Sequence, residues 1–194
     1  MNQRLEEIEN KIKNDPQNIH KTKENISPLY NVTTKSKIII IGQAPGIKAE
    51  VSGQTWNDLS GDKLRQWLGV DRNLFYDPNI FGQLPMDFYY PGKGKHGDLP
   101  PRKGFAEKWH PAILSELHEI KLIILIGSYA QNYYLKDHLT LTERVKNYQK
   151  YLPKYFVLPH PSPLNFRWMN KNPWFLNEVI PNLQEIINKI LQEK

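Results

Sequence analysis

Two short runs of branched apolar residues constrain this chain more than any other feature. They are residues 38–41 and 122–126, and each ends directly at a glycine, Gly42 or Gly127. A run that is apolar at every position has no polar face, which is typical of a strand buried on both sides of a parallel sheet. The two runs therefore predict two central strands of such a sheet.

Two further strands and a set of helices complete the pattern. The third predicted strand covers residues 155–158, and a weaker fourth lies within residues 79–86. Helical signals occupy the gaps between strands, at residues 60–68, 105–119, 128–135 and 176–191. Strands that alternate with helices predict an α/β fold, a three-layer sandwich in which helices flank a central, mostly parallel four-stranded sheet.

The first 35 residues are expected to pack on the same unit. Leu5, Ile8 and Ile12 recur at helical spacing and predict a first amphipathic helix. Residues 16–35 are polar, contain two prolines, and predict an extended linker. Because 194 residues is an ordinary length for one domain, we expect residues 1–194 to form a single domain.

Composition excludes several kinds of site. The chain has no cysteine, which excludes disulfides, a thiolate zinc site, a Cys-bound iron–sulfur cluster and a cysteine nucleophile. The histidines lack the close spacing of metal ligands, so we expect no metal and no other cofactor. The charged N-terminus lacks the apolar core of a secretory signal, and no apolar run is long enough to span a membrane. These features favour a cytoplasmic protein.

The charge balance suits a polyanionic partner. The formal net charge is +6, although many proteins are mildly basic without binding nucleic acid. Residues 85–104 are unlike the rest, being rich in Pro, Gly, aromatic residues and Lys or Arg. A long irregular loop in a compact domain is usually functional or disordered, and the aromatic residues argue against disorder.

Three unusual loops follow the predicted strands: residues 42–46, the pair Gly127–Ser128, and residues 160–165. The carboxyl ends of parallel strands meet at one edge of the sheet, which is where α/β proteins bind ligands. Each loop also has an ordinary interpretation, as a tight turn, a helix cap or a packed histidine. His160, however, lies between two prolines that fix its backbone, which suits a hydrogen-bond donor aimed at developing negative charge.

Taken together, residues 42–46 (GQAPG) and 160–165 (HPSPLN) resemble the two sequence motifs of the uracil-DNA glycosylase superfamily. Both follow the expected strands in the expected order, and residues 53–56 and 60–64 resemble an intervening segment of one branch. The resemblance covers roughly residues 36–190. It implies a DNA glycosylase of base-excision repair, which hydrolyses the N-glycosidic bond of a flipped-out deaminated base, uracil or a related one. Its partner would be DNA, and we expect a monomer.

The resemblance, together with the chemistry of the residues near its motifs, predicts roles for individual residues. His160 would donate a hydrogen bond to the carbonyl oxygen of the departing base, Gln43 would orient a water, and Asp87 is the best available carboxylate to activate it. The flipped base would be held by Gly42, Ala44, Pro45, Gly46, Trp56 and Gln83. The DNA strand would be contacted by Ser128, Ser162, Leu164, Asn165, Lys93, Lys95 and Arg102.

Ala44 departs from the family pattern. The most efficient members carry Asp or Asn at this position to position or activate the attacking water, and alanine does neither. Gln43 matches by position a Glu of the iron–sulfur branch, whose cluster this chain has no cysteine to hold. Two alternatives therefore remain beside the glycosylase: a catalytically weak or silent nucleic-acid-binding relative, and a hydrolase of free nucleosides. The base removed also stays open.

Overall fold

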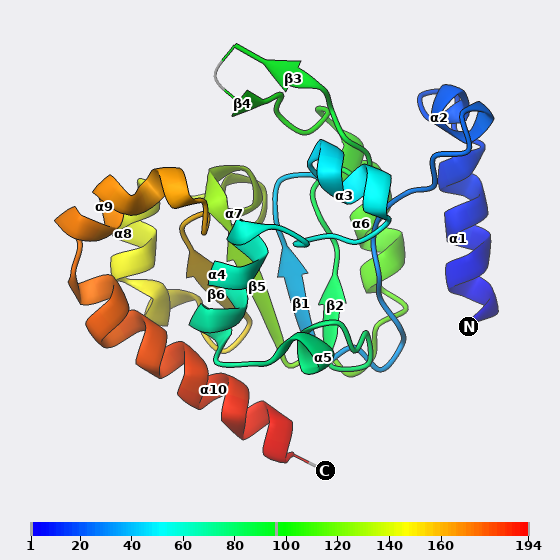
Figure 1. Cartoon of the computed structure of the whole chain (residues 1–194). Coiled ribbons are helices and arrows are strands. Elements are labelled where there is room, and N and C mark those ends of the chain that lie inside the picture. The colour runs from blue at the N-terminus through cyan, green and yellow to red at the C-terminus, as the bar shows by residue number, and fades with distance from the viewer. Residues whose placement is uncertain (1, 96, 194) are drawn as a thin grey trace.

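The computed structural model describes residues 2–95 and 97–193 and has an α/β fold around a four-stranded parallel sheet (Figure 1). The strand order is β2–β1–β5–β6. The bounds are Phe81–Gln83 for β2, Ile38–Ile41 for β1, Leu122–Ile126 for β5 and Tyr155–Leu158 for β6. The predicted fold is confirmed, and the weak strand expected within residues 79–86 is only three residues long.

The central strands are buried along their whole length. Ile38 pairs with Phe81 on one side and with Leu122 on the other, so β1 has a neighbour at both edges. Every residue of β1 and β5 is buried, because helices cover both faces of the sheet. The carboxyl ends of the four strands consequently meet along one edge, the upper edge in Figure 1.

Helices lie on both sides of the sheet. Figure 1 shows α4 (Leu59–Leu68) and α10 (Ile180–Gln192) in front of it, with α6 (Phe105–Leu114) and α7 (Gly127–Leu135) behind. The shorter helices are α3 (Ile47–Ser52), α5 (Arg72–Phe75), α8 (Leu141–Lys146) and α9 (Phe166–Lys171). In the described part of the chain, no helix has the length and apolar character needed to cross a membrane.

Two of the predicted helices differ from those in the structure, and both contain a proline. Pro111 lies inside α6, which ends at Leu114 and not at residue 119. Ahead of α10, residues Phe175–Val179 form a π-helical turn. Pro181 at the start of α10 has no backbone N–H to bond to residue 177, so one continuous α-helix over residues 176–191 is not formed.

The N-terminal segment covers the outer edge of the sheet. Helix α1 (Gln3–Lys13) lies beside α6, and Asn31 forms an antiparallel bridge with Gln83 of β2. The bridge satisfies backbone groups of an edge strand that would otherwise be exposed. The prediction of an extended linker over residues 16–35 is wrong at one place, since Ile19–Lys23 form the short helix α2.

The basic segment 85–104 is ordered by a two-stranded ribbon. Strands β3 (Lys93–Gly94) and β4 (Gly97–Asp98) pair antiparallel, with residue 96 between them outside the described residues. At the base of this hairpin, the Arg102 guanidinium forms an ion pair of 2.7 Å with the fully buried carboxylate of Asp87. Figure 1 shows the hairpin rising beyond the carboxyl edge of the sheet.

A buried histidine links α6 to this region. The His110 Nε2 lies 2.9 Å from the Pro85 carbonyl oxygen and therefore donates to it, while Nδ1 accepts from the Tyr134 hydroxyl at 2.6 Å. The side chain is 1% exposed. Burial penalises the charged imidazolium and lowers the pKa of His110 to about 4.

We expect acid to destabilise the fold through His110. Because its pKa in the folded state lies below the ordinary 6.5, the stabilisation is complete above pH 6.5 and is lost as the pH falls towards 4. The loss between pH 7 and pH 5 should be about 2 kcal/mol of the free energy of unfolding. Urea unfolding at the two pH values measures it. The variant His110→Gln retains a donor for Pro85 without titrating, so an equal loss in this variant would contradict the assignment.

Candidate functional site

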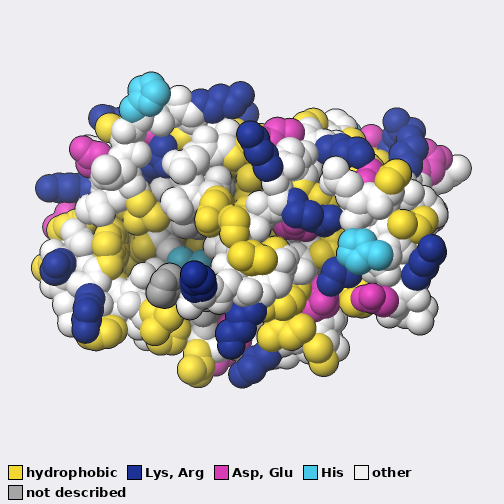
Figure 2. Space-filling view, turned by 90° about the horizontal axis from the view of Figure 1, so that it is seen from above, with side chains coloured by type: hydrophobic (Ala, Val, Ile, Leu, Met, Phe, Trp, Pro, Cys, Tyr) yellow, Lys and Arg dark blue, Asp and Glu magenta, His cyan; other side chains and the backbone are white. Residues whose placement is uncertain are grey.

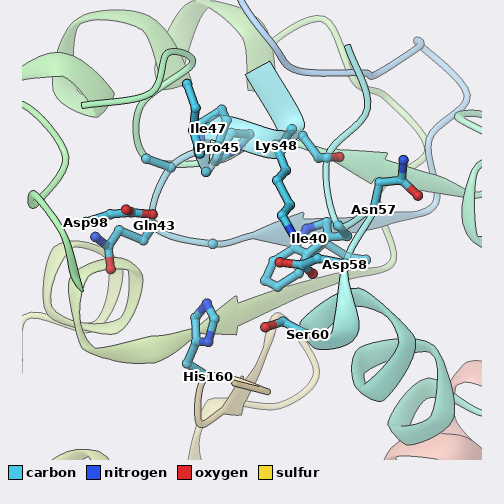
Figure 3. Close-up of a pocket in the computed structure, with 17 residues that line it drawn as sticks. Ile40, Gln43, Pro45, Ile47, Lys48, Asn57, Asp58, Ser60, Asp98 and His160 are labelled. Atoms are coloured by element: carbon cyan, nitrogen blue, oxygen red, sulfur yellow. The ribbon is translucent and has the colours of Figure 1, made fainter. Parts of the chain in front are cut away.

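A cavity of about 350 Å³ opens at the carboxyl edge of the sheet (Figure 3). Its volume lies within the range of roughly 300–1,000 Å³ that is typical of small-ligand sites. The loop after β1, the loop before α4, the β3–β4 hairpin and the loop after β6 all contribute to its wall. Among the residues singled out in the sequence, the wall includes Gly42, Gln43, Ala44, Pro45, Gly46, Trp56 and His160.

The loop after β1 is held by the chain that follows β2. The Met86 and Asp87 amides donate to the carbonyl oxygens of Gly42 and Gln43, at 2.9 and 3.2 Å. This bonding continues the parallel pairing of β1 and β2 beyond the sheet. Gly42 also has to be small, because a Cβ there would lie 2.9 Å from the Trp56 ring. The loop therefore forms one wall of the cavity with the indole packed directly against it.

Trp56 is fixed through its backbone as well as its ring. Its φ of 56° lies in the left-handed region, which is uncommon for a bulky residue and often marks functional sites. Its carbonyl oxygen accepts hydrogen bonds from Arg65 and from the Tyr76 hydroxyl, at 3.2 and 3.1 Å. Gly61 in α4 passes so close that a Cβ there would lie 1.7 Å from this oxygen. The conformation of Trp56 thus depends on groups behind the cavity wall.

The loop after β6 places His160 opposite the indole. The two rings have their centroids 5.8 Å apart and are tilted by 35°. The Ser162 amide donates to His160 Nδ1 at 3.1 Å, and the Asn165 side-chain amide donates to the His160 carbonyl oxygen at 2.7 Å. Since Nδ1 accepts a hydrogen bond from a backbone N–H, a neutral imidazole must carry its proton on Nε2.

Burial also favours the neutral form of His160. Desolvation lowers the pKa of this imidazole below its ordinary value of 6.5, and the carboxylate of Asp58 opposes the shift only in part. At neutral pH the ring is therefore an uncharged N–H donor beside the cavity. Such a group is suited to hydrogen-bond an oxygen on which negative charge develops.

Two smaller hollows adjoin the cavity around His160. The first, of about 230 Å³, is lined by His160 and Gln43 together with Ser128 and Asn165. The second, of about 310 Å³, brings Ser162 beside Ala44 and Asp98. Helix α7 starts at Gly127, one residue before the helix predicted over residues 128–135, so its free backbone amides face this part of the edge. Leu164, in the same loop as Ser162, is 86% exposed.

Three of the expected site residues have structural roles away from the cavity. Asp87 was the expected water-activating carboxylate, but it is 0% exposed and accepts hydrogen bonds from Arg102 and the Tyr89 amide. Gln83 was expected to contact the flipped nucleobase. It is instead buried in β2, and its side-chain amide donates to the Phe75 carbonyl oxygen. Both assignments are wrong because these side chains are already paired inside the fold.

Arg102 is also not placed as a free phosphate contact. Its guanidinium donates to both oxygens of Asp87 and to the Asn18 side chain and the Gln17 carbonyl oxygen. It therefore fastens the hairpin to the N-terminal segment. Lys93 and Lys95, by contrast, are exposed on the hairpin and remain accessible to a polyanion.

Several polar residues of the cavity were not identified from the sequence. Asp58 caps α4 by accepting from the Gly61 amide at 2.9 Å, so the helix begins at Leu59, one residue before the range 60–68 predicted from the sequence. Figure 3 shows Lys48 reaching into the cavity from α3, and Asp98 beside Gln43 on the other side from Asp58. The chain shows a signal for Asp58, as an N-cap before an amphipathic helix, but none for Asp98. Within residues 2–95 and 97–193, no three side chains of the metal-binding types are grouped to hold an ion.

Comparison with known proteins identifies a matching family. The family model described as the uracil DNA glycosylase superfamily matches residues 29–184. Among solved structures, the chain is similar to an NMR structure from Methanosarcina acetivorans of a protein described as a candidate uracil DNA glycosylase. The two share 15% identity with a TM-score of 0.45, over 80% of this chain and 93% of that one.

We expect Gly61→Ala to disturb the cavity from behind its wall. The added methyl group would displace the Trp56 carbonyl oxygen, and the overpacking should cost about 1–3 kcal/mol of the free energy of unfolding. Urea unfolding measures the cost, and Trp fluorescence reports the displaced indole. Gln66→Ala, at an exposed position of the same helix, is the control and should change stability by less than about 0.5 kcal/mol. Equal effects of the two substitutions would show that the Gly61 contact does not hold Trp56.

Proposed function

Because the chain belongs to the uracil DNA glycosylase superfamily, we propose that it excises a deaminated base, uracil or a close relative, from DNA. Members of this superfamily are typically monofunctional hydrolases of N-glycosidic bonds. The base would leave the helix stack and enter the cavity at the carboxyl edge of the sheet. In this proposal the described unit acts alone, as a single domain and a monomer, with DNA as its partner.

Trp56 and the loop after β1 supply a binding surface for a planar base. An aromatic ring that stacks on a nucleobase contributes roughly 1–3 kcal/mol. The indole is already held against Gly42, so little freedom is lost when the base arrives. Backbone groups of Gln43 and Ala44 line the same cavity and are available to the edge of the base.

The state of His160 is the observation that carries this proposal. When the glycosidic bond breaks, its electron pair leaves with the base and negative charge develops on a carbonyl oxygen of the ring. The Ser162 amide keeps the proton of the imidazole on Nε2, and burial keeps the ring neutral. A neutral donor fixed before the reaction stabilises the developing charge without the cost of reorganisation.

The neighbouring residues support contact with the rest of the strand. Ser128, Ser162 and Asn165 lie around the two hollows beside His160, where the sugar and phosphates of a flipped nucleotide would lie. Leu164 is exposed enough to enter the space that the base leaves. Figure 2 shows Lys and Arg side chains spread over this face, with no single stripe, so binding would use dispersed phosphate contacts such as Lys93 and Lys95.

The excision of uracil from an oligonucleotide tests the proposal. Under single-turnover conditions with enzyme in excess, we expect abasic product from the wild type, and a rate lower by roughly 100- to 1000-fold for His160→Ala. His118→Ala is the control, because His118 is exposed and precedes β5 at the opposite edge of the sheet. Its rate should match that of the wild type.

Other outcomes would support the two alternatives. Salt-sensitive DNA binding without abasic product from uracil or hypoxanthine would indicate a catalytically silent relative, which Ala44 motivates. Hydrolysis of free nucleosides without DNA affinity would indicate a small-molecule hydrolase. If the wild type excises uracil and His160→Ala does so at the same rate, the role given to His160 is wrong.

A further inference from the structure

A carboxylate from outside both sequence motifs lies at the cavity. Asp98, in strand β4 of the hairpin, lines the main cavity with Gln43 and His160, and lines the adjoining hollow with Ala44 and Ser162. Ala44 has no group that can accept a proton from water. Asp98 therefore lies over the loop whose own side chain lacks that function.

The position of Asp98 is fixed by three sets of contacts. The ion pair between Asp87 and Arg102 closes the base of the hairpin, and the Gln43 side-chain amide donates to the Leu99 carbonyl oxygen at 3.0 Å. The Tyr90 hydroxyl donates to Asp98 Oδ1 at 3.3 Å. Gln43 thus ties the residue after Asp98 directly to the loop after β1.

The second carboxylate oxygen faces the loop. A Cβ built on Gly46 would lie 3.6 Å from Asp98 Oδ2, which places this oxygen just above the backbone of residues 44–46. Figure 3 shows Asp98 and Gln43 together on one side of the cavity, with Asp58 on the other side and His160 below. An oxygen not used by Tyr90 is therefore directed towards the space beside Gln43.

We propose that Asp98 is the catalytic base of the excision reaction, a proposal that rests on the glycosylase function above. Asp98 accepts a proton from a water that Gln43 helps to orient, while the water oxygen forms a bond to C1′ of the deoxyribose. The bond between C1′ and the base nitrogen breaks, and its electron pair leaves with the base, whose carbonyl oxygen is held by His160. The products are an abasic sugar with a hydroxyl at C1′ and the free base, which takes up a proton from solvent.

The other carboxylates near the cavity are less suited to this role. Asp58 uses Oδ1 to cap α4 and lies two residues after Trp56, the ring on which the base would stack. Glu50 accepts from the Tyr90 amide and from Lys21, and Asp87 is fully buried in its pair with Arg102. The attacking water must approach C1′ from the face away from the departing base, and the proposal places this face on the side of Gln43 and Asp98 (Figure 3).

The test compares two isosteric substitutions. Asp98→Asn removes the proton acceptor but not the volume, and should lower the single-turnover rate of uracil excision by roughly 100-fold or more, the range expected for loss of a general base. The dissociation constant for uracil-containing DNA should change by less than about threefold, because the substitution acts on the reaction and not on binding. Asp77→Asn is the matched control. Asp77 precedes β2 at the opposite edge, and Asn there keeps the acceptor for the Asn79 amide.

Tyr90→Phe separates positioning from proton transfer. Removing this hydroxyl leaves the carboxylate in place but less fixed, so we expect a rate reduction of roughly 3- to 10-fold, smaller than that of Asp98→Asn. The urea midpoint of each variant is measured alongside, because a rate loss with an unchanged midpoint cannot come from unfolding.

Each outcome decides one claim. If the wild type excises uracil and Asp98→Asn does so equally fast, or loses rate only in proportion to lost DNA binding, Asp98 is not the base and the glycosylase function still holds. If the wild type excises no deaminated base, the proposed function itself is overturned. A large rate loss in Asp98→Asn, with binding and the Asp77→Asn rate unchanged, supports the assignment.

Discussion

The parallel pairing of β1 with β5 is the constraint on which the site depends. Both strands are buried at every position, so they fit only in the middle of a sheet that helices cover on both faces. Strand β6 pairs with β5 on the side away from β1. Because all three strands are parallel, the carboxyl ends of β1 and β6 lie at the same edge of the sheet, with β5 between them. Residues 42–46 and His160, more than a hundred residues apart, thereby line one cavity.

Those parts of the site that adjoin a strand end were predictable from the sequence. Gly42 and His160 follow directly on apolar runs, so predicting the strands also fixed the edge at which these residues lie. The contact of Gly42 with the Trp56 ring shows why the first loop begins with glycine, since any Cβ would meet the indole. Local sequence suffices here because the backbone alone determines the position of each loop.

The charged residues between the strands could not be assigned in the same way. Asp87 and Arg102 are fifteen residues apart, and only the folded hairpin shows that they neutralise each other. An unpaired buried carboxylate would be costly, so burial of Asp87 requires this partner, and the pairing leaves neither side chain free to bind a ligand. The sequence of a basic loop does not show whether its carboxylate and arginine bind DNA or bind each other.

The burial of Gln83 could not be predicted because strand β2 is short. Three residues give no periodicity that separates a buried face from an exposed one.

The ion pair between Asp87 and Arg102 also helps to fix the position of Asp98, which lies at the cavity although it is outside both sequence motifs. A side chain on a two-stranded ribbon is positioned less firmly than one at the end of a buried strand, since an isolated hairpin is marginally stable. Here the ribbon is anchored at its base by Asp87 and Arg102, and at β4 by the bond from Gln43 to Leu99. Gln43 thus connects the loop after β1 to the hairpin. Ala44 and Asp98 line the same hollow, so the small side chain in the loop leaves space beside the carboxylate that the hairpin brings in.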